Sequence, residues 1–434
     1  MTLDASAALE VDPLIDDPAT RIIVCCGAGG VGKTTTAAAL GVRAAERGRK
    51  VVVLTIDPAR RLAQSMGIDS LDNTPRRVKG IEGDGELHAM MLDMKRTFDE
   101  IVEAHADGER ARAILENPFY QSLSAGFAGT QEYMAMEKLG QLRARDEWDL
   151  IVVDTPPSRS ALDFLDAPKR LGSFLDGKFI KLLMAPAKMG GRAGMKFLNV
   201  GMSMMTGTLG KLLGGQLLRD VQTFVAAMDT MFGGFRTRAD ATYRLLQAPG
   251  TAFLVVAAPE RDALREAAYF VERLAAEEMP LAGLVLNRVH GSGATRLSAE
   301  RALAAAENLD EGRIVDQRPG KAGVRDATAA SPESPSVTHT DAVARTEAVD
   351  QTSVDHTAMD PTTEQLTAGL LRLHAERMQV LAREQRTRDR FTALHPEVAV
   401  AQVPALPGDV HDLAGLRAIG DRLATGGQTP AGAA

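Results

Sequence analysis

The sequence has few of the residues that define several common protein classes. Only two of its 434 residues are cysteine, and because Cys25 and Cys26 are adjacent they exclude a disulfide framework and a spaced cysteine cluster for metal. Aromatic residues make up 4% of the chain, so Leu, Val, Ala and Met must supply most of the core. The small number and adjacent placement of the cysteines fit a protein of the reducing cytoplasm.

Excess positive charge and long hydrophobic runs are also missing. The formal net charge is -7, which argues against a nucleic-acid partner, because such proteins carry clustered positive charge. No apolar stretch reaches the roughly 18 residues that a membrane span needs, and the N-terminus lacks the pattern of a secretory signal. We therefore expect a cytoplasmic chain without direct membrane insertion, which would need a separate membrane partner for any role in transport.

Short apolar, β-branched runs alternate with helical stretches along the chain. The runs that we expect to be strands are 21–26, 50–56, 86–92, 149–154, 251–258, 281–287 and 397–403. Several are apolar almost throughout, as parallel strands covered on both faces are. The alternation predicts an α/β fold, a doubly wound, mostly parallel sheet of about seven to eight strands.

Changes in composition divide the chain. Residues 168–248 combine helical spacing with many methionines and predict a helical subdomain, whereas residues 291–362 are rich in Ala, Thr, Ser, Asp and Pro and predict a disordered insertion before a long helix. The remaining expected parts are flexible tails at 1–20 and 425–434 and a core formed by 21–167 and 249–424.

The stretch from Gly27 to Thr34, "GAGGVGKT", fits the phosphate-loop pattern G-x-x-x-x-G-K-[ST] between an expected strand and an expected helix. In such a loop, backbone N–H groups and the positive end of the helix dipole bind phosphate oxygens. Lys33 would reach the β- and γ-phosphates, and the Thr34 hydroxyl would bind Mg²⁺. The residues expected to contact ATP here are Gly27, Gly29, Gly30, Val31, Gly32, Lys33, Thr34 and Thr35.

Two further strands end in aspartate. Asp57 follows "VVVLTI" and Asp154 ends "DLIVVD". Ligands of open α/β sheets bind beyond the carboxyl ends of the strands, so we expect both carboxylates to face the phosphates. Asp154 would hold Mg²⁺ through water, and Asp57 would orient or deprotonate the attacking water. The expected catalytic residues are therefore Asp57 and the phosphate-contacting Lys33. For either residue alone, the alternative is a helix-capping aspartate.

The ordered set of motifs resembles the ATPase family of the arsenite pump and of the targeting of tail-anchored membrane proteins. The resembling segments are "GAGGVGKTT", "DPARRLAQSMG", "DTPPSRSALDFLDAP", "VLNRV" and "VPALPGDVHDLAGL". The resemblance implies a P-loop ATPase of the deviant Walker A class and a Mg²⁺-ATP-dependent switch that works as a face-to-face dimer. It also implies that Asn287 and the backbone near Pro404 recognise adenine, and that Asp57 positions the hydrolytic water.

One departure concerns Ala28, where the family carries a lysine that reaches the partner subunit's phosphates. Without this charge a homodimer is expected to hydrolyse ATP slowly, because charge neutralisation in trans accelerates phosphoryl transfer. Three explanations stay open: a heterodimer with a lysine-bearing paralogue, a substitute charge from Arg60 or Arg61, or a weak ATPase that senses ATP.

The ligand sites of the two named relatives are missing as well. The chain has neither the spaced cysteines that bind arsenite nor a C-x-x-C pair for zinc, and its histidines are scattered. The methionines between 184 and 231 would form either a groove for an apolar cargo or a core in which they replace aromatic residues. A partition or cell-division ATPase and a non-catalytic ATP-binding subunit are the competing functions, and a small-molecule kinase has the least support.

Overall fold

The computed structural model describes seven stretches of the chain: residues 8–56, 61–68, 70–118, 120–121, 130–156, 237–316 and 362–425. The chain divides into two compact units. The first comprises Met1–Gly291 together with Arg383–Ala434, and the second comprises Ser292–Ala382. All features of the candidate site belong to the first unit.

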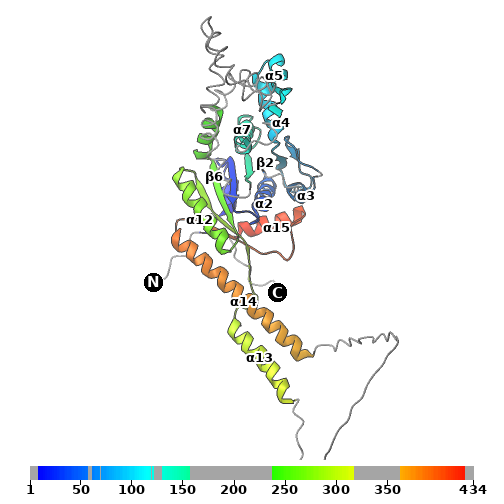
Figure 1. Ribbon diagram of the computed structural model, residues 1–434, viewed down its shortest axis with the longest axis vertical. Coiled ribbons are helices and arrows are strands. Elements are labelled where there is room, and N and C mark those ends of the chain that lie inside the picture. Colours follow the sequence, from blue (N-terminus) through cyan, green and yellow to red (C-terminus); the bar gives the residue numbers. More distant parts are fainter. Residues whose placement is uncertain are drawn as a thin grey trace, which may run out of the picture. The chain divides into compact units, whose positions relative to one another are not determined.

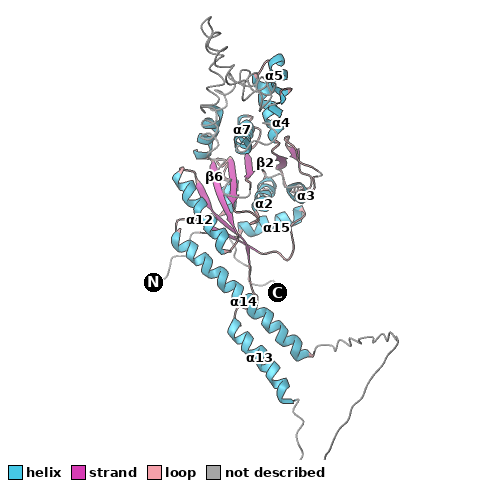
Figure 2. Cartoon of the chain, in the orientation of Figure 1, coloured by secondary structure: helices cyan, strands magenta, loops and turns pink. Residues whose placement is uncertain are grey.

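The first unit is built on one eight-stranded sheet, drawn in magenta in Figure 2. Its strands are β1 (Ile22–Gly27), β2 (Lys50–Thr55), β3 (Arg76–Arg77), β4 (Glu86–Met91), β5 (Leu150–Asp154), β6 (Thr251–Ala257), β7 (Leu281–Val289) and β8 (Val400–Pro404). The order is β3-β4-β2-β5-β1-β6-β7-β8, and every pair is parallel except β3 with β4. The predicted fold class is confirmed, and each expected run contains a strand.

The described helices lie before, between and after these strands, and those between parallel strands belong to crossover connections. They are α1 (Val11–Asp16), α2 (Lys33–Glu46), α3 (Arg61–Ser65), α4 (Met94–His105), α5 (Gly108–Leu115), α7 (Thr130–Ala144), α12 (Arg261–Ala276), α13 (Ala299–Asp316), α14 (Thr363–Leu394) and α15 (Leu413–Ala424). α15, drawn in red in Figure 1, packs beside α2 although some 370 residues separate the two in sequence. The last described helix therefore packs against the helix that follows the phosphate loop.

Both faces of the sheet are buried, which explains why the strands are apolar on consecutive residues. On one face, alternate strand residues such as Ile23 and Val53 pack with α2 and α15. On the other face, neighbours such as Val24 and Val52 pack with α4, α7 and α12. The sheet is thus the middle layer of a three-layer unit, and its strands are held from both sides.

The N-terminal segment differs from the flexible tail expected over 1–20. Val11 and Ile15, four residues apart in α1, are fully buried, and Ala8 pairs with Val400. The Arg49 guanidinium donates hydrogen bonds to the carbonyls of Ile15, Asp17, Thr20 and Asp149 at 2.5–3.2 Å. Apolar spacing and carbonyl binding together order residues 8–20.

The expected insertion 291–362 also differs in its first part, because residues 299–316 form α13. Within the second unit, α13 is joined to α14 by an ion pair between Asp310 and Arg372, and His374 Nε2 donates to Leu297 O at 2.8 Å. Residues 317–361 lie outside the described part of the chain. So do 168–236, the main part of the expected helical subdomain, while 237–247 are helical and bury Ala239 and Leu246 in the core of the first unit.

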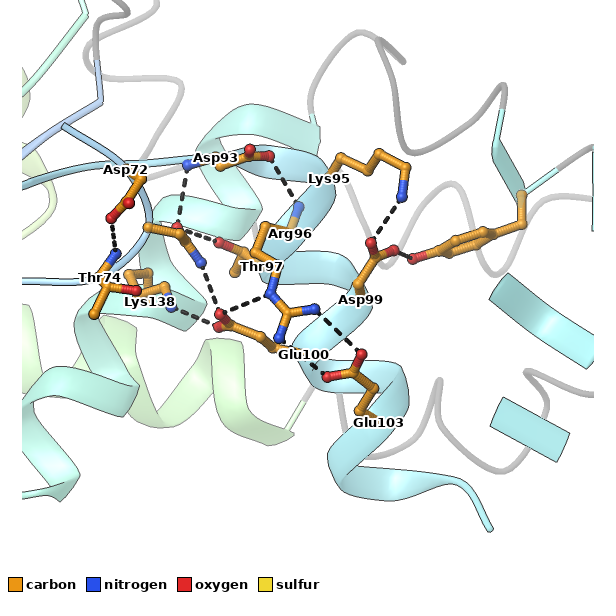
Figure 3. Close-up of polar contacts among 12 residues, drawn as sticks. Asp72, Thr74, Asp93, Lys95, Arg96, Thr97, Asp99, Glu100, Glu103 and Lys138 are labelled. Carbon is orange, nitrogen blue, oxygen red and sulfur yellow. Dashed lines mark hydrogen bonds and ion pairs between the residues drawn. The ribbon is translucent and has the colours of Figure 1, made fainter. Parts of the chain in front are cut away.

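A polar network joins α4 to its neighbours (Figure 3). Asn73 accepts from the Asp93 N–H and the Thr97 hydroxyl at 3.0–3.1 Å, and its amide donates to Glu100. Glu100 also accepts a 2.7 Å bond from Lys138 of α7, whose side chain is 5% exposed. The loop before β3 is thereby connected to both helices through buried polar groups.

Candidate nucleotide-binding site

The loop between β1 and α2 has a backbone that glycine alone accepts readily. Gly27 and Gly32 have φ angles of +146° and +95°, which L side chains rarely adopt. A Cβ at Gly27 would lie 2.1 Å from the Val256 carbonyl oxygen, so the loop leaves the sheet in direct contact with β6. The chain then enters α2 at Lys33, and the first amides of this helix face the loop, as anion binding requires.

Lys33 and Ala28 meet inside the loop. The Lys33 side chain is 6% exposed, and its ammonium donates a 2.7 Å hydrogen bond to the Ala28 carbonyl oxygen. The Ala28 side chain is itself buried and belongs to the same apolar cluster as Val31 and Val256. The structure therefore holds the Lys33 ammonium inside the loop and buries the Ala28 side chain in the core.

Asp154, at the carboxyl end of β5, is an acidic residue of the site. Its Oδ2 accepts hydrogen bonds from the hydroxyls of Thr34 and Thr55 at 2.7 and 2.9 Å. The strand register explains this convergence, since Asp154 is opposite Cys25 on β1 and Thr55 on β2. A hydroxyl and a carboxylate held side by side are oxygen ligands of the kind that Mg²⁺ prefers.

The negative charge of Asp154 also raises the pKa of the neighbouring Cys25 thiol. The pKa of Cys25 is raised well above its ordinary value, first because the thiol is buried and second because the Asp154 carboxylate disfavours a thiolate. Asp154 is fully buried, so few solvent molecules screen that carboxylate. A buried carboxylate with two hydroxyl donors is well prepared to bind a cation.

Asn287, near the end of β7, lies against the phosphate loop. Its Nδ2 donates to the Val31 carbonyl oxygen at 2.8 Å, and its Oδ1 accepts from the Arg288 N–H at 3.0 Å. A Cβ on Gly32 would lie 2.2 Å from this Nδ2, so the close approach depends on glycine. One amide hydrogen and one oxygen lone pair of Asn287 stay available for a ligand.

A groove with a volume of about 990 Å³ connects these groups. It contains seven of the predicted residues: Gly30, Gly32, Lys33, Thr34, Thr35, Asn287 and Pro404. The segment 403–411 and the residues His290 and Glu384 also line the groove. The His290 N–H and its Nδ1 bind the two carboxylate oxygens of Glu384 at 3.1 and 2.5 Å.

Sequence reasoning missed several of these residues. Thr55 could have been found from the expected sheet, because it ends the strand next to Asp154. Arg288 lies within the segment "VLNRV", but the sequence assigned it no role. His290 and Glu384 carry no motif, and Glu384 comes from a helix almost 100 residues further along the chain, so no sequence signal indicated these two residues.

The remaining predicted residues either do not line the groove or lie outside the described residues. Gly29 is exposed and Val31 is buried, and neither lines the groove, while Gly27 and Asp154 lie beneath it in the sheet. Asp57 and Arg60 lie outside the described residues, and of Arg61 only the backbone, in α3, is described.

No group of three or more His, Cys, Asp or Glu residues suited to a metal ion occurs among the described residues. None of their helices combines the length and the apolar character that crossing a membrane requires.

Comparison with known proteins gives one family and several relatives. A family described as Anion-transporting ATPase matches residues 20–296. The protein "ATPase GET3" of Malassezia globosa is 29% identical over 39% of this chain, and "ATPase GET3" of Podospora anserina is 26% identical over 64%. "ATPase ARSA2" of Chlamydomonas reinhardtii is 27% identical over 69%. The matches span 49%, 75% and 76% of these relatives, respectively, so the first covers only about half of the related protein.

Proposed function

The chain belongs to the anion-transporting ATPase family and is an ATPase, and on this premise we propose that it is a magnesium-dependent, dimeric ATP switch. In this proposal, ATP binding and hydrolysis drive or regulate a partner that is membrane-associated or carries hydrophobic cargo. The observation that carries the proposal is the 2.7 Å hydrogen bond from the Thr34 hydroxyl to Asp154 Oδ2 at the phosphate loop.

The triphosphate would bind where the loop amides and Lys33 face the groove. Lys33 is already held close to the loop backbone, so it needs only to exchange the Ala28 carbonyl for a phosphate oxygen. The residues that would hold Mg²⁺ are Thr34, directly, and Asp154, through water. When bound, Mg²⁺ neutralises charge on the β- and γ-phosphates.

The adenine would be read by Asn287 and by the backbone near Pro404. An asparagine amide matches the N6 and N7 edge of adenine with one donor and one acceptor, which are the two functions that Asn287 keeps available. Its bonds to Val31 and Arg288 fix the amide orientation before the base arrives. We assign base recognition to this residue and water positioning to Asp57, the role that the family resemblance implies.

Ala28 favours a second form of this proposal. With a methyl group buried in the core at this position, the chain has no ammonium there to offer to a partner subunit. The chain would then be a slow ATPase by itself and would gain rate from a related subunit that carries the lysine, unless an arginine of the 60–61 pair replaces that charge.

The test is ATP turnover by the purified chain with magnesium and with EDTA, at several protein concentrations. We expect magnesium-dependent hydrolysis that rises faster than linearly with protein concentration as dimers form. Adding a lysine-bearing paralogue should raise the rate, whereas Arg60→Ala and Arg61→Ala should lower it only if these residues supply the charge. Turnover that is linear in protein concentration and unaffected by EDTA would contradict the proposal.

The same preparations separate this function from that of a partition or cell-division ATPase. We expect no nucleotide-dependent binding to DNA or to vesicles of anionic phospholipid. Binding to an apolar helical peptide should differ between the ATP and ADP states. Nucleotide-dependent retention on DNA would favour the partition class instead.

A further inference from the structure

Arg288 has an unusual backbone for its residue type. Its φ is +61°, in the left-handed region that glycine and asparagine occupy more readily than arginine. Such strained residues gather at functional sites, where the surrounding structure holds them in place. Here the holding contact is the bond from the Arg288 N–H to Asn287 Oδ1, so the strain is coupled to the residue that faces the phosphate loop.

The strand pairing shows why the strain arises. Asn287 pairs with Val403 and Val289 pairs with Pro404, so the register shifts across Arg288, which has no partner of its own on β8. A bulge of this kind redirects a side chain at the end of a strand and is common beside active sites. The Arg288 side chain is exposed and lines the groove.

Among the described residues, no charged group around the groove pairs with the Arg288 guanidinium. Among the described lining residues the other lysine or arginine is Lys33, which is bound within the phosphate loop. Glu384, an acid of the same groove, has both carboxylate oxygens occupied by His290. In the described part of the chain, no hydrogen bond or ion pair of the Arg288 side chain is found.

We propose that Arg288 binds the nucleotide by covering one face of the purine base with its guanidinium plane. This inference rests on the proposed function and deepens it, because it adds a base contact next to Asn287. A planar guanidinium stacks on aromatic rings more effectively than an ammonium does. The opposite face of the base would meet the apolar wall that contains Val403, Pro404 and Leu406.

This assignment separates two ways of recognising the base. Asn287 reads the edge of the ring, so it distinguishes adenine from guanine. Arg288 covers the face, which all purines share, so it adds affinity without discriminating between them. It makes no contact with the phosphates, which the loop and Lys33 bind.

The test uses Arg288→Gly, because glycine adopts the observed φ without strain and the fold should survive. Calorimetric titration of the full chain in magnesium would compare ATP, GTP, ADP and inorganic tripolyphosphate. We expect the Kd to rise about three- to tenfold for all three nucleotides and to stay unchanged for tripolyphosphate. Without ligand, the variant should have an equal or higher Tm than the parent chain. Arg288→Lys should recover only part of the nucleotide affinity.

The matched control is Arg265→Ala, which removes an exposed arginine of α12 away from the groove and should change no Kd. An equal loss for tripolyphosphate would assign Arg288 to the phosphates and overturn the inference, as would an unchanged Kd for every ligand. Failure of the parent chain itself to bind MgATP would instead overturn the proposed function, and this inference with it.

Discussion

The Thr34 hydroxyl donates a 2.7 Å hydrogen bond to Oδ2 of Asp154, a residue 120 positions further along the chain. The two meet because β1 and β5 are parallel neighbours whose carboxyl ends lie at the same edge of the sheet. Thr34 lies in the first turn of α2, beyond the end of β1, and Asp154 is the last residue of β5. Several measurable consequences follow from this arrangement and from its surroundings.

Removing either member of this pair should abolish magnesium-dependent turnover. We expect Asp154→Asn and Thr34→Ala each to lower the ATPase rate by about 100-fold or more, because charge stabilisation at the phosphates is lost. Nucleotide affinity measured in EDTA should change little. Thr34→Ser, which keeps the hydroxyl, is the matched control and should retain most of the rate. Near-normal turnover by Asp154→Asn would refute the role of this carboxylate.

Two glycines with nearly the same φ provide a test of the contact between the loop and Asn287. Gly32 and Gly48 have φ of +95° and +94°, but only the Cβ of Gly32 would meet another atom, Asn287 Nδ2 at 2.2 Å. Both alanine variants should lose about 1 kcal/mol of stability through backbone strain. Gly32→Ala should in addition lose ATP affinity by more than tenfold. If calorimetry found the same ATP affinity in both variants, the contact would have no role in binding.

The two cysteines should be inert in the folded protein. Burial raises the pKa of Cys26 from 9.0 to about 12 and raises that of Cys25 well above its ordinary value, so neither forms a thiolate near neutral pH. We expect alkylation by iodoacetamide at pH 8 only at the rate of unfolding. Rapid labelling of the native chain would show that these thiols are accessible.

The same shift makes stability depend on pH. A thiol with a raised folded-state pKa contributes stability below its unfolded value near 9, and this contribution is lost as pH rises from about 9 towards 12. Urea unfolding at pH 8 and pH 10 should therefore show a smaller loss of stability for Cys26→Ala than for the parent chain. The difference between the two chains isolates this thiol from other groups that titrate in the same range.

The ion pair between Lys138 and Glu100 should respond unequally to removal of its two members (Figure 3). Lys138 is 5% exposed and Glu100 is 28% exposed, so Glu100→Ala leaves a buried ammonium unpaired. We expect this change to reduce the free energy of unfolding by about 2 to 3 kcal/mol. Lys138→Met keeps the volume and removes the charge, and should be close to neutral. Equal effects of both variants in urea unfolding would argue against this account.

Much of the architecture could be predicted because the relevant signals are local. Apolar runs covered on both faces identify parallel strands, and a glycine-rich turn before a helix identifies the phosphate loop. Segments with weaker local signals were predicted less completely. The two residues of β3 are too few to show alternation, and α1 was missed because its burial depends on contacts with α2 and α15 and on the Arg49 side chain.

The residue sequence by itself determined the phosphate loop, the class of sheet and the aspartate at the end of β5, since each depends on neighbours within a few positions. Only the tertiary structure decided which further groups line the groove. Glu384, His290 and the strained Arg288 reach the groove through a bulge and a helix far away in sequence. Such contacts between distant segments depend on how layers pack around the sheet, and residue order alone does not encode them locally.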